Sequence, residues 1–356
     1  MVWGILLSMP TPPRLLVAAG LAASLSLEAQ QPPSAPISQT ELVRRLAQTL
    51  DSLAALGQFA GVVVLAREGA PIFERAYGMA DREARHPNDL ETAFNLGSIN
   101  KVFTEIAIRQ LAAAGRLALD SSLARYWPDY PNQEVARRVT IRQLLEHRSG
   151  IGGNIFGSPA GGTRSTIRRL GDYLALFVDE PLQFEPGSRS RYSNAGYVVL
   201  GLLVERLAGQ GYYDYVRGHV YEPGGMTRTA HWAVDSLPPN TALGYTRGDG
   251  DAASRTAPPA RNREILPGRG SSAGGGYSTA RDLVRFLQAL RAGRIPAGPH
   301  AGLGVAGGAP GLNAVLEGGL PGCGCDLVVL ANLDPPAAER IALLVRAWLA
   351  GEGVRR

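Results

Sequence analysis

Cysteine is scarce in this chain, which has 356 residues and only two cysteines, Cys323 and Cys325. A single residue separates them, a spacing too short for an unstrained disulfide bond in an extended segment. Two thiols are also too few to hold a structural metal ion, so we expect no metal and no cofactor. We interpret the pair as small core residues on one face of a strand. A chain of this length can bury enough apolar surface to fold without disulfides.

Long apolar runs are also few. The run at residues 15–27 follows Arg14 and has only 13 residues, which is short for a bilayer core of about 30 Å. With a cleavage site at residues 27–29, it predicts a signal peptide over 1–29, followed by a Pro- and Gln-rich linker over 30–39. We therefore expect an exported protein, periplasmic or secreted, with no stable membrane insertion beyond the signal.

Clusters of basic residues are absent, although the formal net charge is +5. No basic run contains interleaved aromatic residues, so we expect no nucleic-acid partner. Of the 36 Lys and Arg residues, one alone is a lysine, Lys101. Arginine stays protonated in proteins, whereas a buried lysine can lose its proton and then accept one. Lys101 is therefore a candidate for chemistry that arginine cannot perform; a lysine left by chance is the alternative.

Predicted strands lie at both ends of the chain and predicted helices in the middle. Residues 59–67 and 71–77 have the pattern of a β-hairpin. The other predicted elements are helices at 40–56, 102–114, 141–147 and 194–208, a helix at 279–291, strands at 312–316 and 326–332, and a helix at 336–350. This order favours an α/β (α+β) fold: one domain over 40–356, a sheet assembled from both ends, and a helical insertion at about 96–235. We expect the active-site cleft where these two parts meet.

The segment Ser98-Ile99-Asn100-Lys101 carries the strongest chemical signal. Residues three apart on a helix share a face, with Cβ atoms about 5–6 Å apart. A lysine at that distance can polarise the serine hydroxyl and accept its proton, and the start of a helix favours a developing oxyanion. Ser-x-x-Lys is also a common spacing that can be an exposed helix face without function. The position of the sole lysine favours the catalytic interpretation.

A second polar segment, Tyr192-Ser193-Asn194, precedes a predicted helix. A tyrosine beside a lysine can move protons, and an asparagine amide can hold a substrate carbonyl or the lysine. Ser193 or Asn194 also suits a helix cap, and Tyr192 could simply pack. Both interpretations can hold at once.

With these motifs, the chain resembles the class C β-lactamases and penicillin-binding-protein-like serine hydrolases, the large CubicO-type group. The resemblance extends from about Phe59 to Leu349. It is supported by further stretches at 115–120, 144–151, 274–279 and 329–332. It implies a β-lactamase/DD-peptidase-like fold, with a mostly antiparallel sheet flanked by helices and an inserted all-helical subdomain.

The resemblance also implies roles for the two motifs. Ser98 would be acylated, Lys101 and Tyr192 would manage its proton, and Asn194 would bind the substrate. The Ser98 N–H would form half of the oxyanion hole.

The chain departs from the family at the third motif, a Lys-Thr-Gly or His-x-Gly run on the strand beside the nucleophile. Here the segment reads Gly-Val-Ala-Gly-Gly-Ala-Pro-Gly over 304–311. Either Val305 occupies the cationic or imidazole position, or that position has been lost in a deletion before Ala306; His300 is five residues out of register. The missing side chain normally helps to bind a substrate carboxylate, so its absence counts against efficient β-lactam chemistry. Gly307 and Gly308 are retained, and a backbone donor near Gly308 can complete the oxyanion hole.

Three functions compete. The leading hypothesis is hydrolysis through an acyl-enzyme on Ser98, acting on small esters or D-amino-acid-type amides and peptides and acting poorly on β-lactams. The second is a degenerate homologue that binds peptidoglycan-like ligands without turnover. The third is an α/β-hydrolase that uses Ser272 in a Gly-x-Ser-x-Gly elbow, with Asp282 and His300 downstream. All three imply a small-molecule or peptide ligand; the sequence does not specify an oligomeric state.

Overall fold

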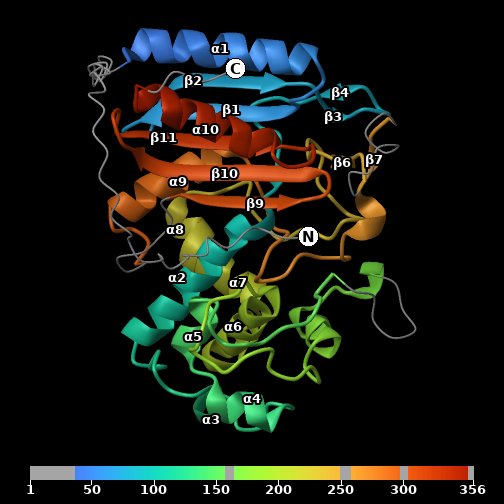
Figure 1. Ribbon diagram of the computed structural model, residues 1–356, viewed down its shortest axis with the longest axis vertical. Helices are drawn as coiled ribbons and strands as arrows, with labels where there is room; N and C mark the ends of the chain where they lie inside the picture. The colour runs from blue at the N-terminus through green and yellow to red at the C-terminus, as the bar shows by residue number, and fades with distance from the viewer. Residues whose placement is uncertain (1–36, 157–163, 249–257, 297–303, 352–356) are drawn as a thin grey trace, which may run out of the picture. The chain divides into compact units, whose positions relative to one another are not determined.

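A five-stranded antiparallel sheet forms the centre of the computed structural model (Figure 1). Its strand order is β2-β1-β11-β10-β9, so segments from the two ends of the chain lie side by side. The strands are β1 (Gly61–Arg67), β2 (Ala70–Tyr77), β9 (Val305–Ala309), β10 (Leu312–Leu320) and β11 (Cys325–Ala331). The structure describes residues 37–156, 164–248, 258–296 and 304–351, which belong to one compact unit, Ala35–Arg356.

Both faces of the sheet are buried, which explains the continuous apolar runs of its central strands. Side chains alternate between the faces of a strand, and here Val62 and Val64 pack into one core while Val63 and Leu65 pack into the other. The second core lies beneath helices α1 (Gln39–Ala55) and α10 (Ala337–Leu349), and the first lies beneath α9 (Ala280–Arg291) and α2 (Asn100–Ala113).

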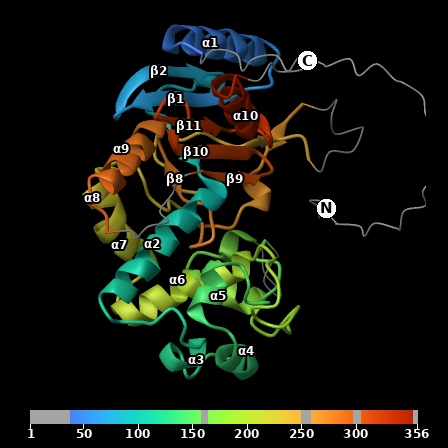
Figure 2. The ribbon, with the colours of Figure 1, turned by 60° about the vertical axis from the view of Figure 1, so that its left-hand side comes forward.

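Helix α2 lies between the sheet and the helices α5 and α6 (Figures 1 and 2). The helices that surround it are α3 (Leu123–Tyr126), α4 (Gln133–Arg138), α5 (Ile141–Leu145), α6 (Asn194–Ala208), α7 (Tyr212–Val216) and α8 (Glu222–Gly224). The 3₁₀ turns are η1 (Gly97–Ile99), η2 (Arg164–Thr166), η3 (Leu170–Leu176) and η5 (Arg263–Ile265), and η4 (Arg217–Tyr221) is a π-helical turn. Short strand pairs are β3 (Met79–Asp81) with β4 (His86–Pro87), β5 (Phe94–Asn95) with β8 (Tyr277–Ser278), and β6 (Tyr245–Thr246) with β7 (Ala260–Arg261).

The predicted fold class, an antiparallel sheet with flanking helices and helices between its two halves, is confirmed. Two local predictions need correction. The first helix is capped by Ser38, whose hydroxyl accepts the Glu41 N–H, and it begins at Gln39, so the end of the predicted linker belongs to the helix. Cys325 begins β11 and is buried, but Cys323 lies in the preceding turn rather than on the same strand face.

The predicted signal peptide over 1–29 and most of the linker lie outside the described residues, as does His300. Among the residues that the structure describes, no helix is long and apolar enough to cross a membrane. The same residues contain no group of three or more His, Cys, Asp or Glu side chains placed to hold a metal ion.

Candidate active site

Ser98 lies in the 3₁₀ turn η1, which leads directly into helix α2. Its Oγ is 3.2 Å from the Nζ of Lys101 in the first turn of α2, as the three-residue spacing predicts. Asn95 stabilises this turn, because its Oδ1 accepts the N–H of Gly97 at 2.9 Å. Gly97 has φ +51°, and a Cβ there would lie 2.9 Å from Leu312, so glycine alone fits this approach to the sheet.

The Lys101 side chain is buried and has three partners. Besides Ser98, its Nζ donates to Asn194 Oδ1 at 2.8 Å and to the carbonyl oxygen of Ala273 at 2.5 Å. Asn194 is the first residue of α6, which Ser193 caps by accepting the N–H of Gly196. The cap and the site function predicted for this segment therefore coexist in neighbouring residues.

Burial lowers the pKa of Lys101 to about 7, because desolvation disfavours the ammonium form. The rings of Tyr192 and Tyr197, with centroids 4.7 and 5.5 Å from Nζ, favour the charged form. No carboxylate among the described residues forms an ion pair with this amine. Desolvation therefore prevails, and near pH 7 a large share of the protein molecules carry a neutral Lys101.

The hydrogen-bond partners of Lys101 match the neutral amine. A neutral –NH₂ group has two N–H donors and one lone pair. The oxygens of Asn194 and Ala273 can only accept, so they take both N–H groups. As the ammonium, Lys101 donates to Ser98 Oγ at 3.2 Å; in the neutral amine the lone pair is the group left for the Ser98 hydroxyl. Lys101 is therefore placed to accept the Ser98 proton.

Tyr192 is the second side chain that contacts the Ser98 hydroxyl. Its hydroxyl donates to Ser98 Oγ at 2.6 Å. Although 55% of the residue is exposed, protein atoms crowd its hydroxyl, and this burial raises the pKa of the phenol despite the opposing bond to Ser98. Tyr192 is consequently a protonated donor at neutral pH, and Lys101 is the better base of the two.

His147 supports the tyrosine rather than the chemistry. Its ring packs against Tyr192 and Tyr197, with centroids 4.6 and 5.0 Å away, and its Nδ1 accepts the Ser193 N–H at 3.2 Å. Burial, together with the charge of Lys101, lowers the pKa of His147 to about 4, so the ring is neutral at pH 7. His147 is therefore a structural residue that accepts a backbone hydrogen bond and packs on Tyr192.

Strand β9 lies against the nucleophile turn along the edge of the sheet. A Cβ on Gly307 would lie 2.1 Å from the Leu96 carbonyl and 2.7 Å from the Ser98 nitrogen. The Gly308 nitrogen is 3.1 Å from the position that a Cβ on Gly97 would take. Because Gly307 and Gly308 have no side chain, the backbone of β9 can approach the turn that holds Ser98. Val305 lies on the same face of β9 as Gly307 and is half-buried, but it does not line the cleft.

A cleft of about 560 Å³ opens at Ser98. Segments from the sheet region and the helical region both line it, as the sequence predicts. Asn194, Gly308 and Ser98 supply polar groups in it. The rest is largely apolar and includes Ile155, Phe156, Tyr173, Val234, Leu266, Pro267, Ala273, Ala309 and Leu312.

Ser272 is not an alternative nucleophile. It is fully buried, and its hydroxyl donates to the carbonyl oxygen of Tyr197 at 2.8 Å. Asp282, the proposed acid of that triad, instead accepts the Arg228 N–H and the Thr229 hydroxyl. The adjacent Ala273 carbonyl, which holds Lys101, was missed from the sequence because a backbone acceptor leaves no residue-type signal.

Comparisons with known proteins agree with this architecture. A sequence model of the Beta-lactamase family matches residues 46–313. Esterase EstB of Burkholderia gladioli is 32% identical over 296 residues, 73% of each chain. PbpX of Bacillus subtilis, named as a penicillin-binding protein, is 28% identical over 239 residues, 67% of this chain but 56% of that protein. The chain thus spans little more than half the length of PbpX.

Solved structures give the same fold. A penicillin-binding protein from Bacillus halodurans has a TM-score of 0.68 at 29% identity, covering 83% of this chain and 98% of that one. The D-amino acid amidase of Ochrobactrum anthropi SV3, complexed with D-phenylalanine, has a TM-score of 0.70 at 24% identity, covering 87% and 98%. At that identity the amidase supports the fold alone.

A serine that opens into the cleft and a lysine in the first turn of the helix that follows it define the class as a serine hydrolase. The family match and the esterase relative show that the chain belongs to the beta-lactamase family. The resemblance predicted from the sequence motifs is confirmed.

Proposed function

We propose that this enzyme hydrolyses small esters or D-amino-acid-type amides through an acyl-enzyme on Ser98. The observation that carries the proposal is the placement of Lys101. Its Nζ contacts Asn194 Oδ1, the Ala273 carbonyl oxygen and Ser98 Oγ. Its pKa is lowered to about 7, and in the neutral form the first two partners take both N–H groups and leave the lone pair for Ser98.

The first half of the reaction forms the ester. Lys101 Nζ takes the proton of the Ser98 hydroxyl while Oγ attacks the substrate carbonyl carbon. The resulting oxyanion is stabilised by the N–H groups of Ser98 and Gly308. The bond to the leaving group then breaks, and the leaving oxygen or nitrogen takes a proton from the Tyr192 phenol or the Lys101 ammonium.

The second half releases the acid. A water molecule attacks the acyl-enzyme carbonyl and gives a proton to the neutral Lys101 or to the Tyr192 oxygen, whichever was deprotonated. Collapse of the second tetrahedral intermediate breaks the bond to Ser98 Oγ, which regains its proton. Net consumption is one water per ester or amide.

The substrate class has two supports. The relative EstB, named as an esterase, is 32% identical over most of both chains. Val305 provides neither the cation nor the imidazole of the third motif, which disfavours β-lactams. D-amino-acid-type amides are supported more weakly, because the amidase shares the fold at only 24% identity.

Covalent labelling tests the proposal. The full-length protein is treated with a fluorescent fluorophosphonate, and the adduct is located by peptide mass spectrometry. We expect labelling at Ser98, loss of labelling in Ser98→Ala, and hydrolysis of 4-nitrophenyl butyrate by the parent alone. A protein that forms no adduct and hydrolyses no ester would be a non-catalytic binder of peptidoglycan-like ligands, the second candidate that the Val305 substitution favours.

A further inference from the structure

A second cavity, of about 610 Å³, adjoins the catalytic cleft. The two cavities share four lining residues, so they lie next to each other at these side chains. Those residues are Asn95, Val234, Leu266 and Leu312. Three of the four are apolar, so the passage from Ser98 to the second cavity favours an apolar part of a ligand.

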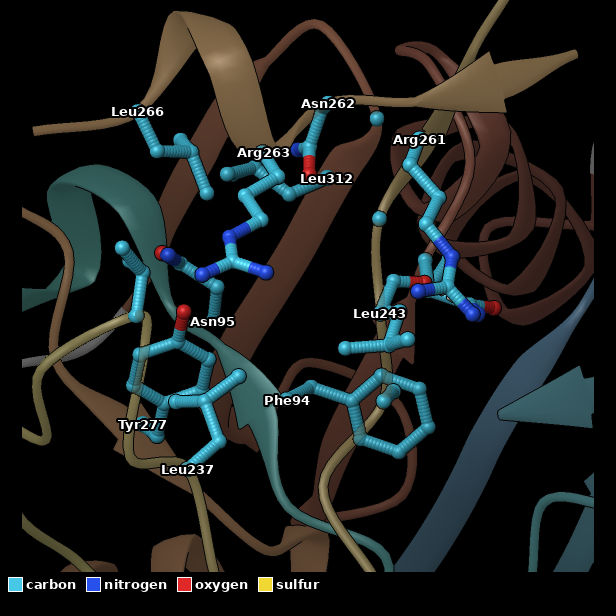
Figure 3. Close-up of a pocket in the computed structure, with 16 residues that line it drawn as sticks. Phe94, Asn95, Leu237, Leu243, Arg261, Asn262, Arg263, Leu266, Tyr277 and Leu312 are labelled. Carbon is cyan, nitrogen blue, oxygen red and sulfur yellow. Dashed lines mark hydrogen bonds between the residues drawn. The ribbon is translucent and has the colours of Figure 1, made fainter. Parts of the chain in front are cut away.

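Beyond this passage the lining becomes polar and cationic. Figure 3 shows the Arg263 guanidinium, the Asn95 amide and the Tyr277 hydroxyl converging on one side of the cavity. Asn95 Oδ1 already accepts the Gly97 N–H, and its Nδ2 donates one hydrogen to the Tyr277 oxygen, which leaves the second Nδ2 hydrogen for a ligand. Burial raises the pKa of Tyr277 to about 12, so its hydroxyl is protonated and can also donate. Three donors, one of them charged, therefore meet in one place.

Among the described residues, the guanidinium of Arg263 forms no hydrogen bond or ion pair. It acts electrostatically on Asp235, but both carboxylate oxygens of Asp235 are bonded to Arg168. No Asp or Glu is among the described residues that line the cavity.

Arg261 provides a contrast within the same cavity. Its guanidinium forms ion pairs with Asp81 and Glu83, each at 2.9 Å, and Figure 3 places it on the side opposite Arg263. A planar guanidinium left unpaired beside two neutral donors is suited to a carboxylate, which can accept two parallel N–H bonds.

We propose that Arg263 is a specificity-determining residue that binds a carboxylate on the substrate, joined by an apolar spacer to the ester or amide that Ser98 attacks. This inference rests on the proposed function at Ser98. The charge comes from the 3₁₀ turn η5 and not from the third-motif strand, where Val305 has none. The preferred substrates are therefore half-esters or half-amides of dicarboxylic acids, and acyl amino acids of similar length.

Matched pairs of aryl esters test the inference. Mono-4-nitrophenyl esters of succinate, glutarate and adipate are each compared with the neutral twin whose distal carboxylate is a methyl ester. The measured quantity is the ratio of kcat/KM for the anionic ester to that for its twin. We expect Arg263→Gln to lower this ratio at least about tenfold, the factor that corresponds to about 1.4 kcal/mol of binding. Arg263→Lys should retain part of the preference for the anionic ester. The matched control Arg261→Gln should leave the ratio unchanged.

A binding measurement removes the dependence on turnover. Calorimetry of glutarate monomethyl ester with Ser98→Ala should give a dissociation constant that rises at least about tenfold when Arg263→Gln is added. Equal binding by both proteins, or an unchanged ester ratio in Arg263→Gln, would overturn the role of Arg263. Failure of Ser98 labelling would instead overturn the proposed function, so the two failures are distinguishable.

Discussion

The Tyr192 hydroxyl lies 2.6 Å from Ser98 Oγ and donates a hydrogen bond to it. Lys101 Nζ lies 3.2 Å from the same oxygen. Because the phenol is the donor, the Ser98 proton is free to point at the lysine, and a neutral lysine can accept it. The two contacts together orient the hydroxyl for attack and assign the base to Lys101 and the proton donor to Tyr192.

Removing the phenol oxygen alone should therefore reduce catalysis without disturbing the fold. We expect Tyr192→Phe to lower kcat/KM for 4-nitrophenyl butyrate by about 10²- to 10⁴-fold, the usual contribution of a positioned proton donor. Tyr197→Phe is the matched control, because both rings pack on His147 but the Tyr197 hydroxyl donates to Leu145. Equal losses in the two variants would contradict the assignment.

The pH dependence should follow the lysine. Since its pKa is lowered to about 7, the neutral, proton-accepting form increases as the pH rises through that value. The value of kcat/KM should rise about tenfold per pH unit below pH 7 and level off above about pH 8. Lys101→Arg keeps a cation but removes the acceptor, and we expect it to lose at least about 10²-fold in the rate of Ser98 phosphonylation. A profile that is flat between about pH 5.5 and 8 would exclude Lys101 as the base.

Much of the fold was predictable because its signals are local. Helix Asn194–Ala208 has a serine cap and an apolar sequence, and strands β1 and β11 are continuous apolar runs because both faces of the sheet are buried. The Ser98–Lys101 contact was predictable for the same reason, since helical geometry sets it. The first helix, predicted to start at residue 40, starts at Gln39 because Ser38 caps it.

The rest of the site depends on contacts that spacing does not encode. The Ala273 acceptor is a backbone atom 172 residues from Lys101. The cavity that holds Arg263 is assembled from β5, η5 and β8, which are far apart in the sequence. Sequence patterns report which face of an element is buried, but not which distant polar groups remain unpaired after folding.

Asn194 lies next to the Lys101 amine, so a charge introduced at this position should shift the pKa of Lys101. Asn194→Asp keeps the shape and the acceptor 2.8 Å from Nζ but adds a negative charge. A carboxylate at that distance favours the ammonium, so the acid limb of kcat/KM should move to higher pH by about 1–3 units. Asn194→Ala removes the acceptor without adding charge and serves as the comparison. A limb that stays in place in the aspartate variant would show that Lys101 does not produce it.

Gly307 should be intolerant of even one methyl group. Its Cβ would lie 2.7 Å from the Ser98 nitrogen and 2.1 Å from the Leu96 carbonyl, so β9 must move away from the oxyanion site. We expect Gly307→Ala to slow fluorophosphonate labelling of Ser98 by at least about 10²-fold, as for loss of one oxyanion donor. Gly218→Ala, where a Cβ meets no atom within 4 Å, is the matched control. Normal labelling of Gly307→Ala would show that the strand does not complete the site.

The buried lysine should also leave a thermodynamic signature. Its pKa falls from 10.5 to about 7 on folding, so between these pH values the unfolded chain binds more protons than the native one. The free energy of unfolding therefore rises with pH in this window, by up to about 1.4 kcal/mol per pH unit from this group. Lys101→Met has no titrating group at this position. The free energy of unfolding in urea is measured for the parent and for this variant, and their difference cancels the contributions of all other titrating groups. The difference should grow in favour of the parent from about pH 7 to about pH 9; a constant difference would mean that Lys101 is protonated in the folded enzyme and cannot be its base.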